Sequence, residues 1–203
     1  MITIINYKMG NLRSVHNALD YLGYKNEVVN EPEKILTADK LLLPGVGSFR
    51  QAMQNIKEMD LYEPICEMVL GKKIPILGIC LGMQLLAKSS DEDGFTEGFG
   101  FIDDEVVKFN IDKSYRVPHV GFNSVTFNKN NATLFENLED NTDFYFVHSY
   151  RMGAIDKPFV SGVCEYGEKF TAVFEQDNVF GTQFHPEKSQ SNGLKMLINF
   201  AKL

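Results

Sequence analysis

Apolar residues in the first 88 positions recur with two different periods. Between Leu12 and Leu22 they recur every three or four residues, which predicts an amphipathic helix with Asn11 as its N-cap. Short apolar runs predict buried strands, which lie at 2–6, 27–30, 40–43 and 74–79. Further helices are predicted at 49–59, 61–70 and 81–88, with a weaker one after Pro32. Strands that alternate with helices are typical of a parallel sheet with right-handed crossovers.

After position 88 the pattern changes to short β-rich runs. Residues 89–100 are acidic and rich in glycine, so we expect an exposed loop there. The β-rich runs lie at 106–109, 124–127, 144–150, 160–166, 171–176 and 179–184, and a final helix is predicted at 193–202. We therefore predict an α/β fold: a central, mainly parallel sheet flanked by helices, plus a smaller antiparallel β layer from the second half. No linker or repeat interrupts the chain, so residues 1–203 are expected to form a single domain.

The composition narrows the class of protein. The 203 residues are 44% hydrophobic and 23% charged, which is typical of a globular chain and not of a disordered one. The net charge of −7 disfavours nucleic-acid binding, which needs a basic surface. The longest apolar stretch, residues 74–87, contains proline and glycine and is too short to span a membrane. Because the N-terminus also lacks the features of a signal peptide, we expect a cytoplasmic protein without membrane contact.

The chain has three cysteines, Cys66, Cys80 and Cys164, and none of them forms a CxxC pair. An odd number argues against a disulfide framework, and the spacing argues against a zinc site. We expect no metal and no cofactor, and we interpret Cys66 and Cys164 as structural residues. Cys80 differs because it is the centre of the sequence Gly-Ile-Cys-Leu-Gly at 78–82, where a predicted buried strand meets a predicted helix.

A Gly-x-Cys-x-Gly sequence at a strand-to-helix junction is the thiol counterpart of the nucleophile elbow of serine hydrolases. The two glycines remove side chains that would collide in so tight a turn. The N-terminus of the helix favours the thiolate, and the N–H of Leu81 is placed to donate to an oxyanion. These features predict a nucleophilic Cys80. The alternative is a buried structural cysteine in a glycine-rich turn.

A thiolate nucleophile needs a base, and His185 is the best candidate among the four histidines. It begins the sequence His-Pro-Glu, directly after the predicted strand at 179–184. The proline keeps this segment extended, so the side chains of His185 and Glu187 share one face and the carboxylate can orient the imidazole. The alternative is a histidine at a strand end beside a surface glutamate. Of the other histidines, His16 is expected at a helix surface. His119 and His148 are expected to be hydrogen-bonded polar residues, and His148 could line a pocket.

The sequence Pro-Gly-Val-Gly-Ser at 44–48 follows the third predicted strand. Ligands of parallel sheets bind beyond the carboxyl ends of the strands, where Cys80 is also expected. The glycines on either side of Val46 allow a peptide plane to turn and to direct an N–H towards the site. A phosphate-binding loop is the competing interpretation. Neither of the common phosphate-binding patterns, G-x-x-x-x-G-K-[ST] or G-x-G-x-x-G, is present at the required place.

Six segments carry a resemblance to a known family. Residues 44–47, 78–84 and 185–189 resemble the motifs of the class I (triad) glutamine amidotransferases. Residues 9–15, 118–123 and 145–150 resemble stretches of one subfamily, the glutaminase subunits of imidazole glycerol phosphate synthase. The similarity extends from residue 2 to the last helix. It implies the flavodoxin-like fold of that class, with a mainly parallel central sheet.

The resemblance also implies a role for each residue that matches a family motif. Cys80 would form a γ-glutamyl thioester, His185 would act as base and then acid, and Glu187 would orient His185. The oxyanion donors would be the N–H groups of Leu81 and of the Val46–Gly47 segment. The positions that match the binding site for the amino-acid end of L-glutamine are Gly47, Gln84, Glu92, Ser149 and Tyr150.

The same resemblance implies a partner. The ammonia would pass to a separate (β/α)₈-barrel cyclase subunit, which forms imidazole glycerol phosphate for histidine biosynthesis, within a heterodimer. The residues expected to face that subunit are Asn11, His119, Phe122, Asn123 and Lys188. The subfamily usually has tryptophan in place of Phe122 and a small residue in place of Lys8. Both departures would suit a related subunit that supplies ammonia for amidation of a surface-polysaccharide sugar. Two further alternatives are a free-standing cysteine hydrolase and a non-catalytic scaffold.

Overall fold

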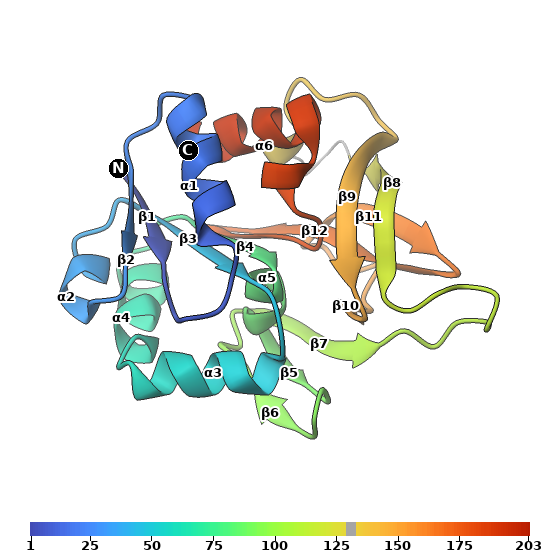
Figure 1. Cartoon of the computed structure of the whole chain (residues 1–203), viewed down its shortest axis with the longest axis horizontal. Coiled ribbons are helices and arrows are strands. Elements are labelled where there is room, and N and C mark those ends of the chain that lie inside the picture. Colours follow the sequence, from blue (N-terminus) through green and yellow to red (C-terminus); the bar gives the residue numbers. More distant parts are fainter. Residues whose placement is uncertain (129–132) are drawn as a thin grey trace.

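The computed structural model describes residues 1–128 and 133–203 and contains two sheets (Figure 1). The main sheet begins with five parallel strands, in the spatial order β2 (Asn26–Val29), β1 (Ile2–Ile5), β3 (Lys40–Gly45), β4 (Ile76–Cys80) and β13 (Val179–Thr182). It continues with antiparallel strands, in the order β12 (Glu168–Gln176), β11 (Val160–Tyr166), β8 (His119–Phe127) and β9 (Thr142–His148). The smaller sheet has the order β10 (Tyr150–Met152), β7 (Ile102–Lys108), β5 (Ala87–Ser90) and β6 (Thr96–Glu97).

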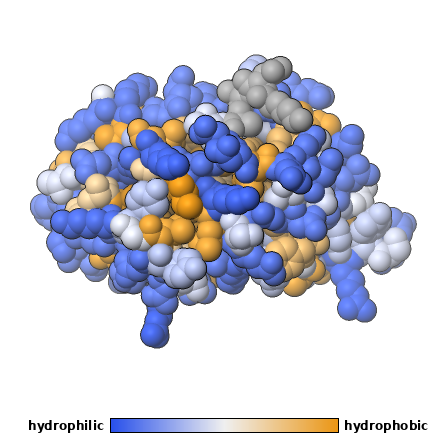
Figure 2. Space-filling model, turned by 90° about the horizontal axis from the view of Figure 1, so that it is seen from above, coloured by the Kyte–Doolittle hydropathy of each residue, from blue (hydrophilic) through white to orange (hydrophobic). Residues whose placement is uncertain are grey.

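Helices cover both faces of the parallel half of the main sheet (Figure 1). One face carries α1 (Leu12–Tyr21) and α6 (Gln190–Lys202), and the other carries α3 (Phe49–Glu58), α4 (Tyr62–Cys66) and α5 (Leu81–Leu85). The remaining helical turns are α2 (Pro32–Ile35), a π-helical turn (Glu67–Gly71) and two 3₁₀ turns, Thr133–Phe135 and Pro186–Lys188. Seen from the side of α1 and α6, the surface is largely hydrophilic, with apolar atoms between the polar groups (Figure 2).

The alternation of side chains along the strands produces one apolar core on each face of the sheet. In β3, Leu41 and Leu43 pack into the core under α3 and α4, whereas Leu42 packs into the core under α1 and α6. Both faces are therefore buried, which explains why these strands are uniformly apolar in the sequence. The predicted α/β fold is confirmed: the main sheet has a parallel half flanked by helices and an antiparallel half, and the smaller sheet is mixed.

Four details of the predicted elements differ from the structure. The helix predicted at 81–88 ends at Leu85, and the acidic segment at 89–100, expected as an exposed loop, contributes β5 and β6. The reason is pairing with a distant segment, since β5 joins β7 in parallel and buries Ser89 and Ser90. The helix predicted at 61–70 divides into α4 and the π-helical turn. Asn11 occupies the N-cap position of α1, but its side chain makes no capping hydrogen bond.

The strand order brings four chain segments to one edge of the sheet. The segment 6–11 follows β1, the segments 44–48 and 80–82 begin at the ends of β3 and β4, and His185 lies just after β13. These strands are parallel, so their carboxyl ends meet at this edge, the usual place for a site in such a sheet. Within the described parts of the chain, no helix has both the length and the apolar character needed to cross a membrane.

Candidate active site

The turn at Cys80 has the geometry of a nucleophile elbow. Cys80 ends β4 and directly precedes α5, with φ of 55° and ψ of −111°. A positive φ is strained for a residue with a side chain and persists only where the surroundings enforce it. A Cβ atom at Gly78 would lie 2.6 Å from the Cα of Met83, and one at Gly82 would clash with the carbonyl oxygen of Leu43. The two glycines are therefore required by close backbone packing, as the sequence predicted.

The Cys80 sulfur lies in a polar, nearly closed setting. The residue is only 6% exposed, and its thiol donates to the carbonyl oxygen of Val147 at 3.8 Å. The side-chain amide of Gln183 donates to the sulfur at 3.7 Å. This donor stabilises a negative sulfur. Burial raises the pKa of Cys66 and raises that of Cys164 to about 12, so neither of these two thiols is a competent nucleophile.

His185 and Glu187 form the pair predicted from the His-Pro-Glu sequence. The Nδ1 atom of His185 is 2.9 Å from Oε1 of Glu187, and each side chain is 2% exposed. The Nε2 atom of His185 is buried and has no hydrogen-bond partner among the described residues, which leaves it available to a reacting group. Burial alone lowers the pKa of His185, but Cys80 and Glu187 outweigh it and raise this pKa to about 10. The pair therefore favours the imidazolium form of His185.

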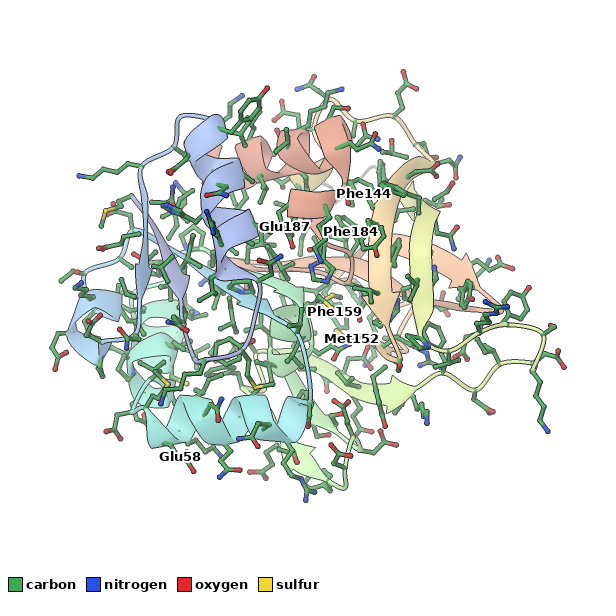
Figure 3. The ribbon with its side chains drawn as sticks, viewed as in Figure 1. Glu58, Phe144, Met152, Phe159, Phe184 and Glu187 are labelled. Atoms are coloured by element: carbon green, nitrogen blue, oxygen red, sulfur yellow. The ribbon has the colours of Figure 1, made fainter. Side chains whose placement is uncertain are left out.

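An aromatic stack fixes the backbone that carries His185. Phe184, the preceding residue, stacks on Phe144 of β9 with ring centroids 4.0 Å apart and an interplanar angle of 14°. The N–H of His185 donates to the carbonyl oxygen of Tyr145 at 2.9 Å. Figure 3 shows Phe184, Phe144 and Glu187 together in the interior, next to α6. The base is thus held by packing between β13, β9 and α6.

A cavity of about 330 Å³ lies in front of Cys80, a volume at the small end of ligand pockets. Its lining includes all five residues expected to bind the amino-acid end of glutamine, namely Gly47, Gln84, Glu92, Ser149 and Tyr150. The remaining lining residues are Val46, Cys80, Leu81, Pro118, Val147 and His148. The structure therefore brings the nucleophile, the expected oxyanion segment and the expected substrate contacts to one pocket.

Gln183 is a site residue that the sequence did not indicate. The Nε2 atom of Gln84 donates to Oε1 of Gln183 at 3.0 Å and to the carbonyl oxygen of Tyr150 at 2.9 Å. Gln183 in turn donates to the Cys80 sulfur, so these amides connect the nucleophile to the pocket wall. The available signal was its position two residues before His185 in an extended segment, which puts both side chains on one side.

Glu92 joins the pocket to the start of α3. Its carboxylate accepts the backbone N–H of Phe49 at 2.8 Å, and the hydroxyl of Ser48 donates to Asp93 at 3.1 Å. Burial raises the pKa of Glu92, and the hydrogen bond from Phe49 opposes that shift. The acidic segment predicted as a loop therefore anchors the end of the 44–48 segment.

His119 and His148 form a buried pair behind the pocket. The Nδ1 atom of His119 is 3.2 Å from Nε2 of His148, whose Nδ1 atom is 2.8 Å from the carbonyl oxygen of Tyr150. Burial lowers the pKa of His119 to about 4 and that of His148 to about 3, so both are neutral at pH 7. The prediction that both are hydrogen-bonded and that His148 lines a pocket is confirmed. The prediction that the His119 side chain faces a partner is wrong, because the pleat of β8 turns it inward and leaves it 2% exposed.

The other expected partner-facing residues lie at or near the surface. Phe122 is 50% exposed and its ring contacts Tyr145 edge-on, with centroids 5.6 Å apart. The Nζ atom of Lys188 lies 5.9 Å from the centre of the Tyr145 ring. Asn11 is exposed, and the half-buried Asn123 donates to the carbonyl oxygen of Glu165 at 3.0 Å. Phe122, Tyr145 and Lys188 thus form one exposed aromatic and basic patch.

A cysteine on a strand-to-helix turn, a buried His–Glu pair and a mainly parallel sheet together define a class of protein. The chain belongs to the class-I glutamine amidotransferase family, whose sequence profile matches residues 3–203. It is 50% identical over 203 residues to imidazole glycerol phosphate synthase subunit HisH 1 of Campylobacter jejuni, and the match covers 100% of both chains. It is 46% identical over 202 residues to subunit HisH 2 of Methanococcus maripaludis, covering 100% of this chain and 99% of the relative.

Solved structures share the fold at low sequence identity. A crystal structure of a glutamine amidotransferase matches 100% of this chain and 99% of its own with a TM-score of 0.76 at 18% identity. The structure of PurLQS from Thermotoga maritima matches 99% of this chain and 97% of its own, also with a TM-score of 0.76, at 19% identity. These similarities support the flavodoxin-like fold of the class.

Proposed function

We propose that this protein hydrolyses L-glutamine to glutamate and ammonia as a subunit of imidazole glycerol phosphate synthase. The observation that carries the proposal is the His185–Glu187 pair, with a free Nε2 atom, at the same pocket as the strained Cys80. The full-length similarity to HisH subunits supports the histidine-pathway assignment. We further propose that residues 1–203 act as a single domain in the cytoplasm, where the three free cysteines stay reduced.

The chemistry follows from the positions of these groups. The Cys80 thiolate attacks the side-chain carbonyl carbon of glutamine, and the carbonyl oxygen becomes an oxyanion that accepts the N–H of Leu81 and an N–H of the Val46–Gly47 segment. The imidazolium of His185 gives its Nε2 proton to the amide nitrogen, the C–N bond breaks, and ammonia leaves. His185 then takes a proton from water, the resulting hydroxide attacks the thioester, and glutamate leaves with Cys80 restored as thiolate.

Glu187 orients the base and transfers no proton in this scheme. Its hydrogen bond to Nδ1 keeps Nε2 directed at the reaction and stabilises the imidazolium. Glu187→Gln is therefore expected to lower turnover far less than His185→Ala. Steady-state glutamine hydrolysis by the two variants tests the assignment, and equal losses would mean that Glu187 takes a direct part in proton transfer.

The pocket wall supplies groups for the amino-acid end of the substrate. The Glu92 carboxylate and the remaining amide oxygen of Gln84 suit the α-ammonium group, and the backbone around Ser149 and Tyr150 suits the α-carboxylate. Gly47 lets the main chain approach the substrate, since its φ of 113° is in the region that glycine favours.

The partner in this proposal is a (β/α)₈-barrel cyclase subunit that receives the ammonia within a heterodimer. A subunit of a two-part synthase needs a docking face, and the exposed Phe122 and Lys188 offer one beside the pocket. The proposed face also includes Asn11 and Asn123. Glutamine-dependent formation of imidazole glycerol phosphate by the mixed subunits tests this assignment. Ammonia transfer to a sugar acceptor instead would favour the polysaccharide-amidating alternative, for which the phenylalanine at 122 is the motivating observation.

A further inference from the structure

A buried hydroxyl group beside the 44–48 segment has no role in the scheme above. Tyr7 is the second residue after the end of β1 and is fully buried. Its hydroxyl has no hydrogen-bond partner among the described residues. Burying a donor without a partner costs free energy, so such a group needs an explanation. Burial, and then Cys80, raise the pKa of Tyr7, which keeps the hydroxyl protonated and able to donate.

The hydroxyl lies where the oxyanion segment begins. A Cβ atom at Gly45 would collide with the Tyr7 hydroxyl oxygen, so this oxygen fills the place that a side chain at position 45 would take. Gly45 is also the partner of Cys80 in the pairing of β3 with β4. Tyr7 therefore lies one peptide away from the N–H of Val46, which is one of the proposed oxyanion donors.

Tyr7 is fixed, whereas the peptide beside it has freedom to turn. The Tyr7 ring packs in the core with Phe49 and Leu81, and its carbonyl oxygen accepts the side-chain N–H of Asn55 at 3.0 Å. Val46, by contrast, is 40% exposed and is flanked by two glycines. Because the ring is packed in the core, a turn of the segment can bring a partner to the hydroxyl.

We propose that Tyr7 is a positioning residue for the oxyanion donor. When the Gly45–Val46 peptide turns its N–H towards Cys80, its carbonyl oxygen points away from the reaction and accepts the Tyr7 hydroxyl. The hydrogen bond missing from the resting structure then forms only in the active one, and it stabilises the active conformer. This inference rests on the proposed glutaminase function and names the contact that positions the oxyanion donor.

The chain after Tyr7 connects this contact to the proposed docking face. A Cβ atom at Gly10 would lie 3.2 Å from the carbonyl oxygen of Pro44, and one at Gly47 would lie 2.6 Å from the Cε atom of Met9. The exposed Asn11 follows directly. A partner that binds at Asn11 therefore acts on a loop that already touches both ends of the 44–47 segment.

The test is Tyr7→Phe, which removes the hydroxyl and keeps the ring. Thr3→Val is the matched control, because Thr3 is also fully buried on β1 and its hydroxyl is also without a partner among the described residues. Glutamine hydrolysis is measured for each variant in the complex with the cyclase subunit, with imidazole glycerol phosphate as the acceptor-site ligand. The unfolding midpoint of each isolated chain is measured alongside.

We expect Tyr7→Phe to lower kcat in the complex about three- to tenfold, the effect of one hydrogen bond, with KM unchanged. Its unfolding midpoint should equal or exceed that of the wild type, since an unpaired buried group is removed. Thr3→Val should leave kcat unchanged. A Tyr7→Phe complex with wild-type kcat, or a fall in kcat matched by an equal fall for Thr3→Val, would overturn the inference. A wild-type complex that does not hydrolyse glutamine would instead refute the proposed function.

Discussion

In the proposed mechanism, two neighbouring strand ends carry the chemistry of this protein, and they are built in opposite ways. The elbow at 78–82 is closely packed: Gly78 and Gly82 touch backbone atoms, and Cys80 is 6% exposed. The 44–48 segment lies beside it, with Gly45 paired to Cys80, yet Val46 is 40% exposed. We infer a division of labour for the proposed mechanism, in which the nucleophile Cys80 is fixed and the oxyanion donor of the 44–48 segment can be moved.

Removing the nucleophile should have the largest effect. Cys80→Ala is expected to abolish glutamine hydrolysis, because neither Cys66 nor Cys164 lies in the pocket and burial raises the pKa of both thiols. The fold should survive the loss of one sulfur atom. Circular dichroism and steady-state hydrolysis by the complex measure the two properties. The loss of one oxyanion donor alone lowers turnover to about a hundredth of the wild-type value. If Cys80→Ala retains more turnover than that, another residue carries the chemistry.

Activation by the partner subunit tests whether the 44–48 segment can move. If the resting 44–48 segment does not offer its N–H, the intermediate lacks one donor, and such a loss costs roughly 10²–10³ in turnover. The isolated chain is therefore expected to hydrolyse glutamine at least about a hundredfold more slowly than the complex with the cyclase subunit and acceptor. The rate of glutamine hydrolysis, measured for the isolated chain and for the complex, tests this expectation. Equal rates would mean that the segment is as fixed as the elbow.

The close packing of the elbow at 78–82 predicts that a substitution that disturbs it destabilises the fold. Gly82→Ala should destabilise the fold by about 3 kcal/mol or more, since the new methyl group would clash with the backbone of Leu43. Gly71→Ala is the matched control, because a Cβ atom there would lie 3.9 Å from the Cγ atom of Glu67, an ordinary van der Waals contact. Denaturant unfolding measures both variants. A Gly82→Ala chain as stable as the Gly71→Ala chain would show that the elbow is less rigid than its contacts indicate.

A smaller, pH-dependent effect is expected at the pocket wall. The pKa of buried His148 is about 3, below its value of about 6.5 in an unfolded chain. Because the unfolded chain binds the proton first, the stability that His148 contributes is present above pH 6.5 and is lost as the pH falls towards 3. Wild-type unfolding free energy should therefore fall more steeply below pH 6.5 than that of His148→Gln, by up to about 1.4 kcal/mol per pH unit. Equal slopes would contradict the neutral, buried assignment.

The sequence predicted those parts of the site that depend on neighbouring residues. The elbow follows from glycine spacing at a strand-to-helix junction, and the His185–Glu187 pair follows from an extended segment with proline between them. Gln183 was missed because its hydrogen bonds join β13, α5 and β4, which only the folded chain brings together. The pairing of β5 with β7 was missed for the same reason.

The sequence also did not predict which single side chains are buried. His119 lies in a segment that resembles a partner-binding loop, but the pleat of β8 decides which side chains point inward. Tyr7 has no motif at all, and its importance comes from the contact with Gly45. Lys8 departs from the usual small residue and takes a φ of 66°, with its N–H bonded to Asn6. Such features depend on strand register and on backbone geometry.

The most direct test of the account is covalent labelling of the nucleophile in the complex. A thiol-reactive glutamine analogue should modify Cys80 alone, and peptide mass spectrometry should find Cys66 and Cys164 unmodified. Excess L-glutamine should protect Cys80, because substrate and analogue share the pocket, and His185→Ala should slow the labelling. Labelling of another cysteine, or a Cys80 that stays unmodified in the active complex, would contradict the assignment of a glutaminase site.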